Sequence, residues 1–74
     1  MQDTDRNYQA FLKELAKMSE FFCDMLSEGR QQLYWERMYT QVTMDEWVYA
    51  CGQAIDRETF HKVPLPAALL VYVE

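Results

Sequence analysis

The sequence predicts an all-α fold, a small orthogonal bundle of four helices around a single core. Apolar residues recur at helical spacing along most of the 74 residues, which is the main sequence sign of amphipathic helices. Helix-start signals and a pair of prolines divide this pattern into four segments. The connections between the segments are so short that we expect crossing helices rather than an up-and-down bundle.

The first helix is predicted to begin at Asp3 or Thr4, both of which are good N-caps. It is predicted to end at Gly29, because glycine suits the left-handed position that follows a helix. We expect its apolar stripe to face the core, with the two methionines filling gaps. The stripe comprises Tyr8, Phe11, Leu12, Leu15, Met18, Phe22, Met25 and Leu26.

A second helix is expected over about residues 31–41, with an inward face formed by Leu33, Tyr34, Trp35 and Met38. The strongest local signal follows it, the capping box Thr43-Met44-Asp45-Glu46. In such a box the threonine hydroxyl accepts from the third helical amide, and the glutamate reaches back to the cap amide. The sequence therefore predicts that a third helix begins directly after Thr43.

The third helix is predicted to run to about Glu58, with apolar residues at helical spacing from Trp47 onward. We expect Trp47 to be a core residue, together with Leu15 and Phe22 of the first helix. Gly52 lies inside the third helix, where glycine is unfavourable. The expected reason for this glycine is the close approach of another helix backbone.

The last segment follows a short extended turn over residues 60–63. Pro64 or Pro66 is expected at the first position of a fourth helix, where the missing amide of proline is harmless. Residues 67–73 are apolar nearly all round, and the sequence then ends at Glu74. We therefore expect residues 1–74 to be one domain, the N-terminal part of a longer protein.

The charge balance argues against direct contact with nucleic acid. The net charge is −5, from 12 acidic and 7 basic residues, and no basic run occurs, whereas phosphate contacts require a basic face. Whether Arg30, Arg37 and Arg57 come together as a basic patch stays open at this stage. An acidic surface suits a protein partner that carries a basic patch.

The location expected from the sequence is the cytoplasm. A secreted domain of this size normally carries four or more cysteines, and this chain has only Cys23 and Cys51. The polar N-terminus does not resemble a signal peptide. The longest apolar run is too short to span a membrane, so no membrane contact is expected.

Catalytic and metal-binding signals are weak. His61 is the only histidine, and no nucleophile elbow or orienting partner accompanies it. Its spacing from the cysteines matches no zinc pattern. We therefore expect no enzyme activity and no cofactor or metal. A thiol-based sensor or small enzyme that uses Cys23 or Cys51 is kept as an alternative.

Four signals follow one another in the second half of the chain. They are Leu33-Tyr34-Trp35, Thr43-Met44-Asp45-Glu46 with Ala50, the aromatic Phe60, and the helix start Pro66-Ala67-Ala68-Leu69. This order resembles a family of small helical proteins from bacteriophages and bacteria, the replicative-helicase loader/inhibitor type. The chain departs from that family in its longer junction between Phe60 and Pro64.

The resemblance implies a helical scaffold without catalysis that binds a hexameric replicative helicase or an initiator. Some partner contacts would lie in a C-terminal extension absent from this chain. On this basis we expect a non-enzymatic protein-interaction module. Its candidate partner-binding surface comprises the exposed acidic edge of the first helix, Glu14, Glu20, Asp24 and Glu28, with the end around Phe60 to Leu69. The first alternative is a homodimer that buries residues 70–73.

Overall fold

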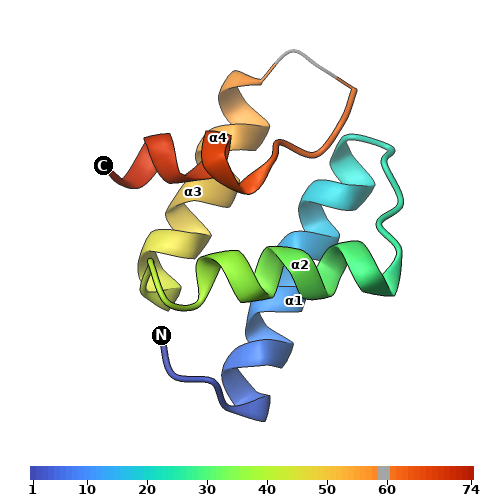
Figure 1. The fold of residues 1–74 in the computed structure, drawn as a ribbon. Coiled ribbons are helices and arrows are strands. Elements are labelled where there is room, and N and C mark those ends of the chain that lie inside the picture. The colour runs from blue at the N-terminus through green and yellow to red at the C-terminus, as the bar shows by residue number, and fades with distance from the viewer. Residues whose placement is uncertain (59–60) are drawn as a thin grey trace.

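Helices make up most of residues 1–58 and 61–74, the part of the chain that this computed structural model describes (Figure 1). The elements are α1 (Asp5–Phe21), α2 (Glu28–Met38), α3 (Met44–Arg57), α4 (Pro66–Leu70) and a 3₁₀ turn, η1 (Val71–Val73). No strand occurs within those described ranges. The predicted all-α fold with four helices is therefore confirmed.

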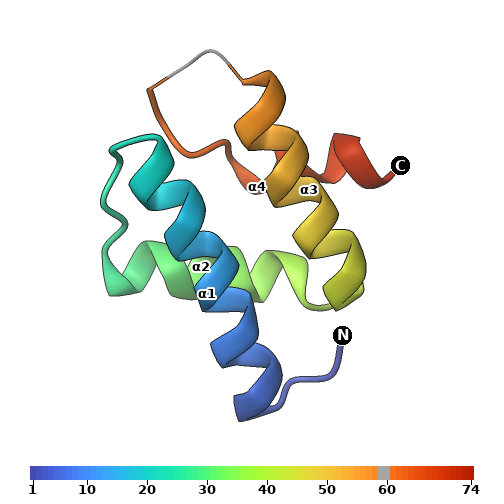
Figure 2. The same cartoon turned by 180° about the vertical axis from the view of Figure 1, so that it is seen from behind.

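The helices lie in two layers. Figure 1 shows α2 and α4 in front of α1 and α3, and the reverse view in Figure 2 shows α1 and α3 in front. The shortest dimension of the Cα trace is 16 Å, which leaves room for two layers of helices about 8–10 Å apart. Helices of one layer cross those of the other, as expected for an orthogonal bundle.

Side-chain caps fix where the three longer helices begin. The hydroxyls of Thr4 and Ser27 accept from Asn7 and Arg30 amides at the starts of α1 and α2. At α3 both halves of the capping box are formed. The Glu46 amide donates to the Thr43 hydroxyl over 3.2 Å, and the Thr43 amide donates to the Glu46 carboxylate over 2.9 Å. The predicted capping box is therefore confirmed.

The end of α1 differs from the prediction. The helix ends at Phe21, and Cys23 takes the left-handed conformation with φ 53°. The Asp24 amide donates to the Ser19 carbonyl over 3.0 Å, and the Cys23 amide donates to the Glu20 carbonyl over 3.2 Å. This pair of bonds defines a Schellman motif, which satisfies the last carbonyls of a helix.

The prediction that Gly29 ends the first helix is therefore wrong. Ser27 is a stronger signal, because its hydroxyl caps the next helix and places Gly29 in the first turn of α2. The earlier end also takes Met25 out of helical register, and its side chain is 84% exposed rather than in the core. Leu33, expected to face inward, is exposed as well.

Trp47 is the centre of the core and has no exposed surface. Its ring stacks on Phe11 with 4.1 Å between ring centroids, and its indole N–H donates to the Phe11 carbonyl over 3.2 Å. Trp35 of α2 packs edge-on against Phe11. Leu15 and Phe22 are also buried. The predicted core role of Trp47, Leu15 and Phe22 is confirmed.

The C-terminal segment packs along α3. Pro66 is at the first position of α4, and Leu69 in that helix is 0% exposed. In η1, the Tyr72 hydroxyl donates to the Glu58 carboxylate over 2.8 Å. This apolar segment is therefore partly covered by its own domain, while Ala67, Ala68 and Val71 stay exposed.

Gly52 does not mark the close approach of another helix, so that prediction is wrong. It lies on the exposed face of α3, and a Cβ atom there would meet nothing within 4 Å. We predict that Gly52→Ala raises the free energy of unfolding by about 0.5–1 kcal/mol, because alanine restricts the unfolded chain. Urea unfolding followed by tryptophan fluorescence measures this. A lower midpoint than wild type would contradict the prediction.

Candidate functional site

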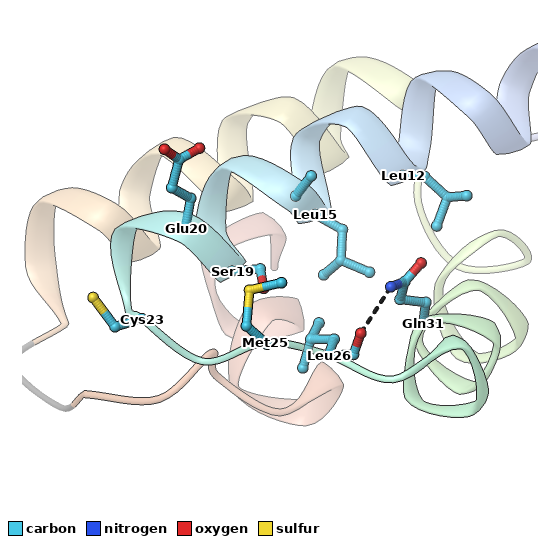
Figure 3. A pocket seen from close by; sticks show the side chains of 9 residues that line it. Leu12, Leu15, Ser19, Glu20, Cys23, Met25, Leu26 and Gln31 are labelled. Atoms are coloured by element: carbon cyan, nitrogen blue, oxygen red, sulfur yellow. Dashed lines mark hydrogen bonds between the residues drawn. The ribbon is translucent and has the colours of Figure 1, made fainter.

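An open apolar depression lies between α1 and α2. We call it the α1–α2 hollow, and its volume is about 610 Å³. Its lining residues come from the C-terminal half of α1, the connection after it and the first turn of α2. They are Leu12, Leu15, Ala16, Ser19, Glu20, Cys23, Met25, Leu26 and Gln31. Figure 3 shows most of these side chains gathered around one space.

The hollow has three sides, α1, α2 and the connection between them, and their arrangement follows from where α1 ends. The two helices cross near their middle and diverge toward the connection between them, which closes the wide end (Figure 1). At the narrow end the Tyr8 hydroxyl bonds to the Gln32 side chain over 3.1 Å. Had α1 continued to Leu26 as predicted, Met25 would not line this space.

Two hydrogen bonds hold the connection in place. The Ser19 hydroxyl donates to the Asp24 carbonyl over 2.7 Å. The Gln31 side-chain amide donates to the Leu26 carbonyl over 2.9 Å, the dashed line in Figure 3. Because these bonds satisfy backbone groups next to an apolar surface, the wide end is preformed rather than built when a ligand arrives.

Acidic side chains mark the same end of the hollow. Glu20 is the only charged residue among those that line it. Glu28 lies one helical turn before Gln31 on α2, so its exposed side chain is on the neighbouring part of the edge. Both predicted contact residues are exposed. The structure therefore places Glu20 in the lining of an apolar surface and Glu28 on α2 one turn from the lining residue Gln31.

Glu14, another predicted contact residue, lies away from the hollow. Its side chain is only 15% exposed, and Lys17 Nζ lies 2.8 Å from its carboxylate. Burial, and after it this carboxylate, raises the pKa of the Cys51 thiol, so Glu14 lies near Cys51. Glu14 therefore belongs to the side of α1 that faces α3.

The carboxylate of Asp24 is bonded within the domain, so it is not a free acidic group at the surface. Its carboxylate accepts the Val63 amide over 3.0 Å and lies 3.4 Å from the Arg30 guanidinium. These two partners, Val63 first, hold the pKa of Asp24 below its usual range. The Tyr34 hydroxyl also donates to the Pro64 carbonyl over 2.8 Å. Together these bonds attach the segment before α4 to the rest of the domain.

The other two predicted contact residues do not extend the surface. Leu69 is fully buried in the core, so its assignment as a contact residue is wrong for this fold. Phe60 lies outside the residues that the structure describes. Sequence reasoning did not place Leu12, Ala16 and Met25 in the lining of a surface hollow, and the Ser27 cap was the signal that could have revealed them.

The three arginines do not form a single basic patch. Arg30 faces Asp24. Arg37 is in the last turn of α2, just before α3 begins, whereas Arg57 is in the last turn of α3. The 14 residues of α3 therefore separate their backbones by about 20 Å. This arrangement gives no concentrated site for nucleic-acid phosphates.

The thiols also differ in environment. Cys51 is buried, and burial followed by the Glu14 carboxylate raises the pKa of its thiol, which disfavours the reactive thiolate. Cys23 is exposed at the edge of the hollow. Over residues 1–58 and 61–74, no three His, Cys, Asp or Glu side chains are placed to hold a metal ion.

Asp24 gives a prediction about pH. Its pKa is lowered by folding, so its ionised form stabilises the fold above the unfolded pKa, about 3.9. That stability is lost as the pH falls through the lower, folded pKa. We predict that Asp24→Asn unfolds at lower urea than wild type at pH 6, and that the difference shrinks by pH 2. Asp56→Asn, an exposed change on α3, is the control. A difference that is the same at both pH values would contradict this role.

No family model, curated protein or solved structure matches this chain. Among the helices in the described part of the chain, none is both long enough and apolar enough to cross a membrane. The function must therefore be inferred from the chain's own residues. A ligand could recognise the α1–α2 hollow with its acidic edge. A second hollow, of about 580 Å³, lies beside α4 and has Arg30 and Lys62 in its lining.

Proposed function

We propose that this chain is a non-enzymatic protein-interaction module, and that the α1–α2 hollow receives apolar side chains of a protein partner. The observation that carries the proposal is the hollow itself, an apolar space of about 610 Å³ that is open to solvent beside the buried core. Met25 stands on its edge with 84% of its surface exposed. Exposed apolar patches of this kind mark binding sites.

The chemistry of the lining suits a protein ligand. Leucine and alanine side chains from α1 provide rigid apolar walls, and burying them yields roughly 25 cal/mol per Å². Met25 is flexible and polarisable, so it can adapt to the side chain that it covers. Hydrogen bonds on the connection keep the hollow open before binding, which limits the entropy lost on association.

The alternative proposal, a homodimer that buries residues 70–73, has less support than docking of a different protein. Its expected interface was residues 70–73, but Leu70, Tyr72 and Val73 pack against the core. Val71 alone of the four is exposed. Two copies would also bring together chains with a net charge of −5 each, which repel one another. A partner of different charge is therefore the better fit.

The specific partner implied by the family resemblance is a hexameric replicative helicase. That version of the proposal makes the chain a factor in phage-type DNA replication, and it would place the protein in the cytoplasm. Its contact with DNA would then be indirect, since the acidic surface repels phosphate groups. The capping box and the proline helix start support the resemblance only as structural features.

The docking proposal predicts the effect of filling the hollow. Ala16 lines it and is exposed, so Ala16→Trp should occupy the space without disturbing the core. Ala10→Trp, an exposed change on the opposite face of α1, is the matched control. We predict that wild type and Ala10→Trp capture the same partner from a source-cell extract, and that Ala16→Trp captures at least tenfold less, a loss of about 1.4 kcal/mol.

Two results would contradict the docking proposal. One is equal capture by the two tryptophan variants, which would place any contact elsewhere. The other is the absence of any stoichiometric partner with the wild-type protein. Circular dichroism and urea unfolding check that both variants keep the fold.

The helicase version makes a separate prediction. Purified protein mixed with the replicative helicase of its source should co-migrate with the hexamer in size-exclusion chromatography with light scattering. Ala16→Trp should weaken this complex, and Ala10→Trp should not. Separate elution of the wild-type protein and the helicase would reject the helicase as partner and leave the docking proposal standing.

A further inference from the structure

The shape and charge of the hollow narrow the class of partner. Resting on the proposed function, we infer that the docked segment is a cationic amphipathic helix. Its apolar side chains would enter the hollow, and its Lys or Arg side chains would face Glu20 and Glu28. Three observations carry this inference, namely the length of the hollow, the backbone around it and the distribution of charge.

The length of the hollow matches two turns of a helix. From Leu12 to Glu20 its wall along α1 extends eight residues, about 12 Å of helix axis. An amphipathic helix places apolar side chains at positions i, i+3 or i+4, and i+7, which span the same distance. Two or three such side chains would lie along Leu12, Ala16 and Met25.

The backbone around the hollow excludes the main alternative for a peptide ligand. An extended peptide gains most of its affinity by pairing with an open strand edge, and residues 1–58 and 61–74 contain no strand. The walls are two helices, whose backbone groups are paired along their length, and the connection between them. A ligand that pairs its own backbone groups, as a helix does, therefore suits this surface.

The acidic side chains near the hollow indicate that the polar face of the ligand carries basic side chains. Glu20 lines the hollow on α1, and Glu28 lies on α2 one turn before the lining residue Gln31. Neither has a basic partner among the ion pairs of the described residues. Among the basic residues near this end, Lys17 pairs with Glu14 and Arg30 with Asp24, and Lys62 lies near Asp24, whose pKa it lowers less than Val63 and Arg30 do. Lys13 lies about two turns from Glu20, toward the narrow end.

The cationic residues of the ligand should therefore gather near the wide end. Exposed ion pairs of this kind contribute little affinity in high dielectric. They favour cationic over anionic ligands and speed association at low salt. Apolar contact in the hollow would supply affinity, and the acidic edge would supply selectivity.

Three synthetic peptides of about 18 residues test the inference. The first is an amphipathic helix with leucines on one face and lysines on the other. In the second, every lysine is replaced by glutamate. The third has the same composition as the first, but its residues are reordered so that the leucines no longer lie on one face of a helix. Each is titrated into the whole chain by isothermal calorimetry at low and high salt.

The cationic amphipathic peptide should bind at least about tenfold more tightly than the anionic one, and added salt should reduce the difference. The scrambled peptide should bind weakly. Glu20→Lys should remove most of the preference for the cationic peptide. The matched control is Glu36→Lys, an exposed change on α2 outside the hollow with the same change in net charge.

Each contrary result has a defined meaning. Equal binding of the cationic and anionic helices would overturn the charge inference and leave the apolar hollow as a docking site. Tight binding of the scrambled peptide would show attraction by net charge alone and overturn the helical inference. Binding of neither helix would also overturn it, while capture by wild type against Ala16→Trp would still decide the proposed function separately.

Discussion

The contact of Trp47 with Phe11 is the interaction on which the rest of the fold depends. It joins α3 to α1 by ring stacking and by a hydrogen bond from the indole N–H to the Phe11 carbonyl. Trp35 then packs against the other side of Phe11 and brings in α2. In a chain of 74 residues few other side chains bury so much apolar area. The Thr43 capping box serves this contact, because it fixes the start of α3 and so the direction of Trp47.

The α1–α2 hollow depends on a second, local constraint, the end of α1 at Phe21. Cys23 adopts a left-handed conformation that costs a residue with a side chain about 1 kcal/mol relative to glycine. The Schellman hydrogen bonds and the Ser19 hydroxyl compensate by pairing the backbone groups of the turn. The chain then turns away from α1 instead of completing another turn over the core. Met25 is left exposed as a result, and the domain carries an apolar surface that its own folding does not use.

Sequence signals from neighbouring residues predicted much of this structure, whereas contacts between residues far apart in the sequence were not predicted. The Thr43 capping box and the burial of Leu15 and Trp47 follow from neighbouring residues, and the sequence was sufficient for them. The end of α1 was missed because Gly29 and Ser27 are competing signals, and periodicity alone does not show which prevails. The role of Asp24 could not be foreseen, since its partner Val63 is 39 residues away.

The position of Asp24 also explains why this carboxylate, unlike those of Glu20 and Glu28, is engaged within the domain. Pairing with Arg30 and with the Val63 amide directs this carboxylate toward the segment before α4. The same pairing engages the Arg30 guanidinium with Asp24. Glu20 and Glu28 thus keep their charge available beside an apolar surface, one on each helix. The hydrogen bond to Val63 and the ion pair with Arg30 therefore tie the segment before α4 to the rest of the domain, and Glu20 is the charged residue that lines the hollow.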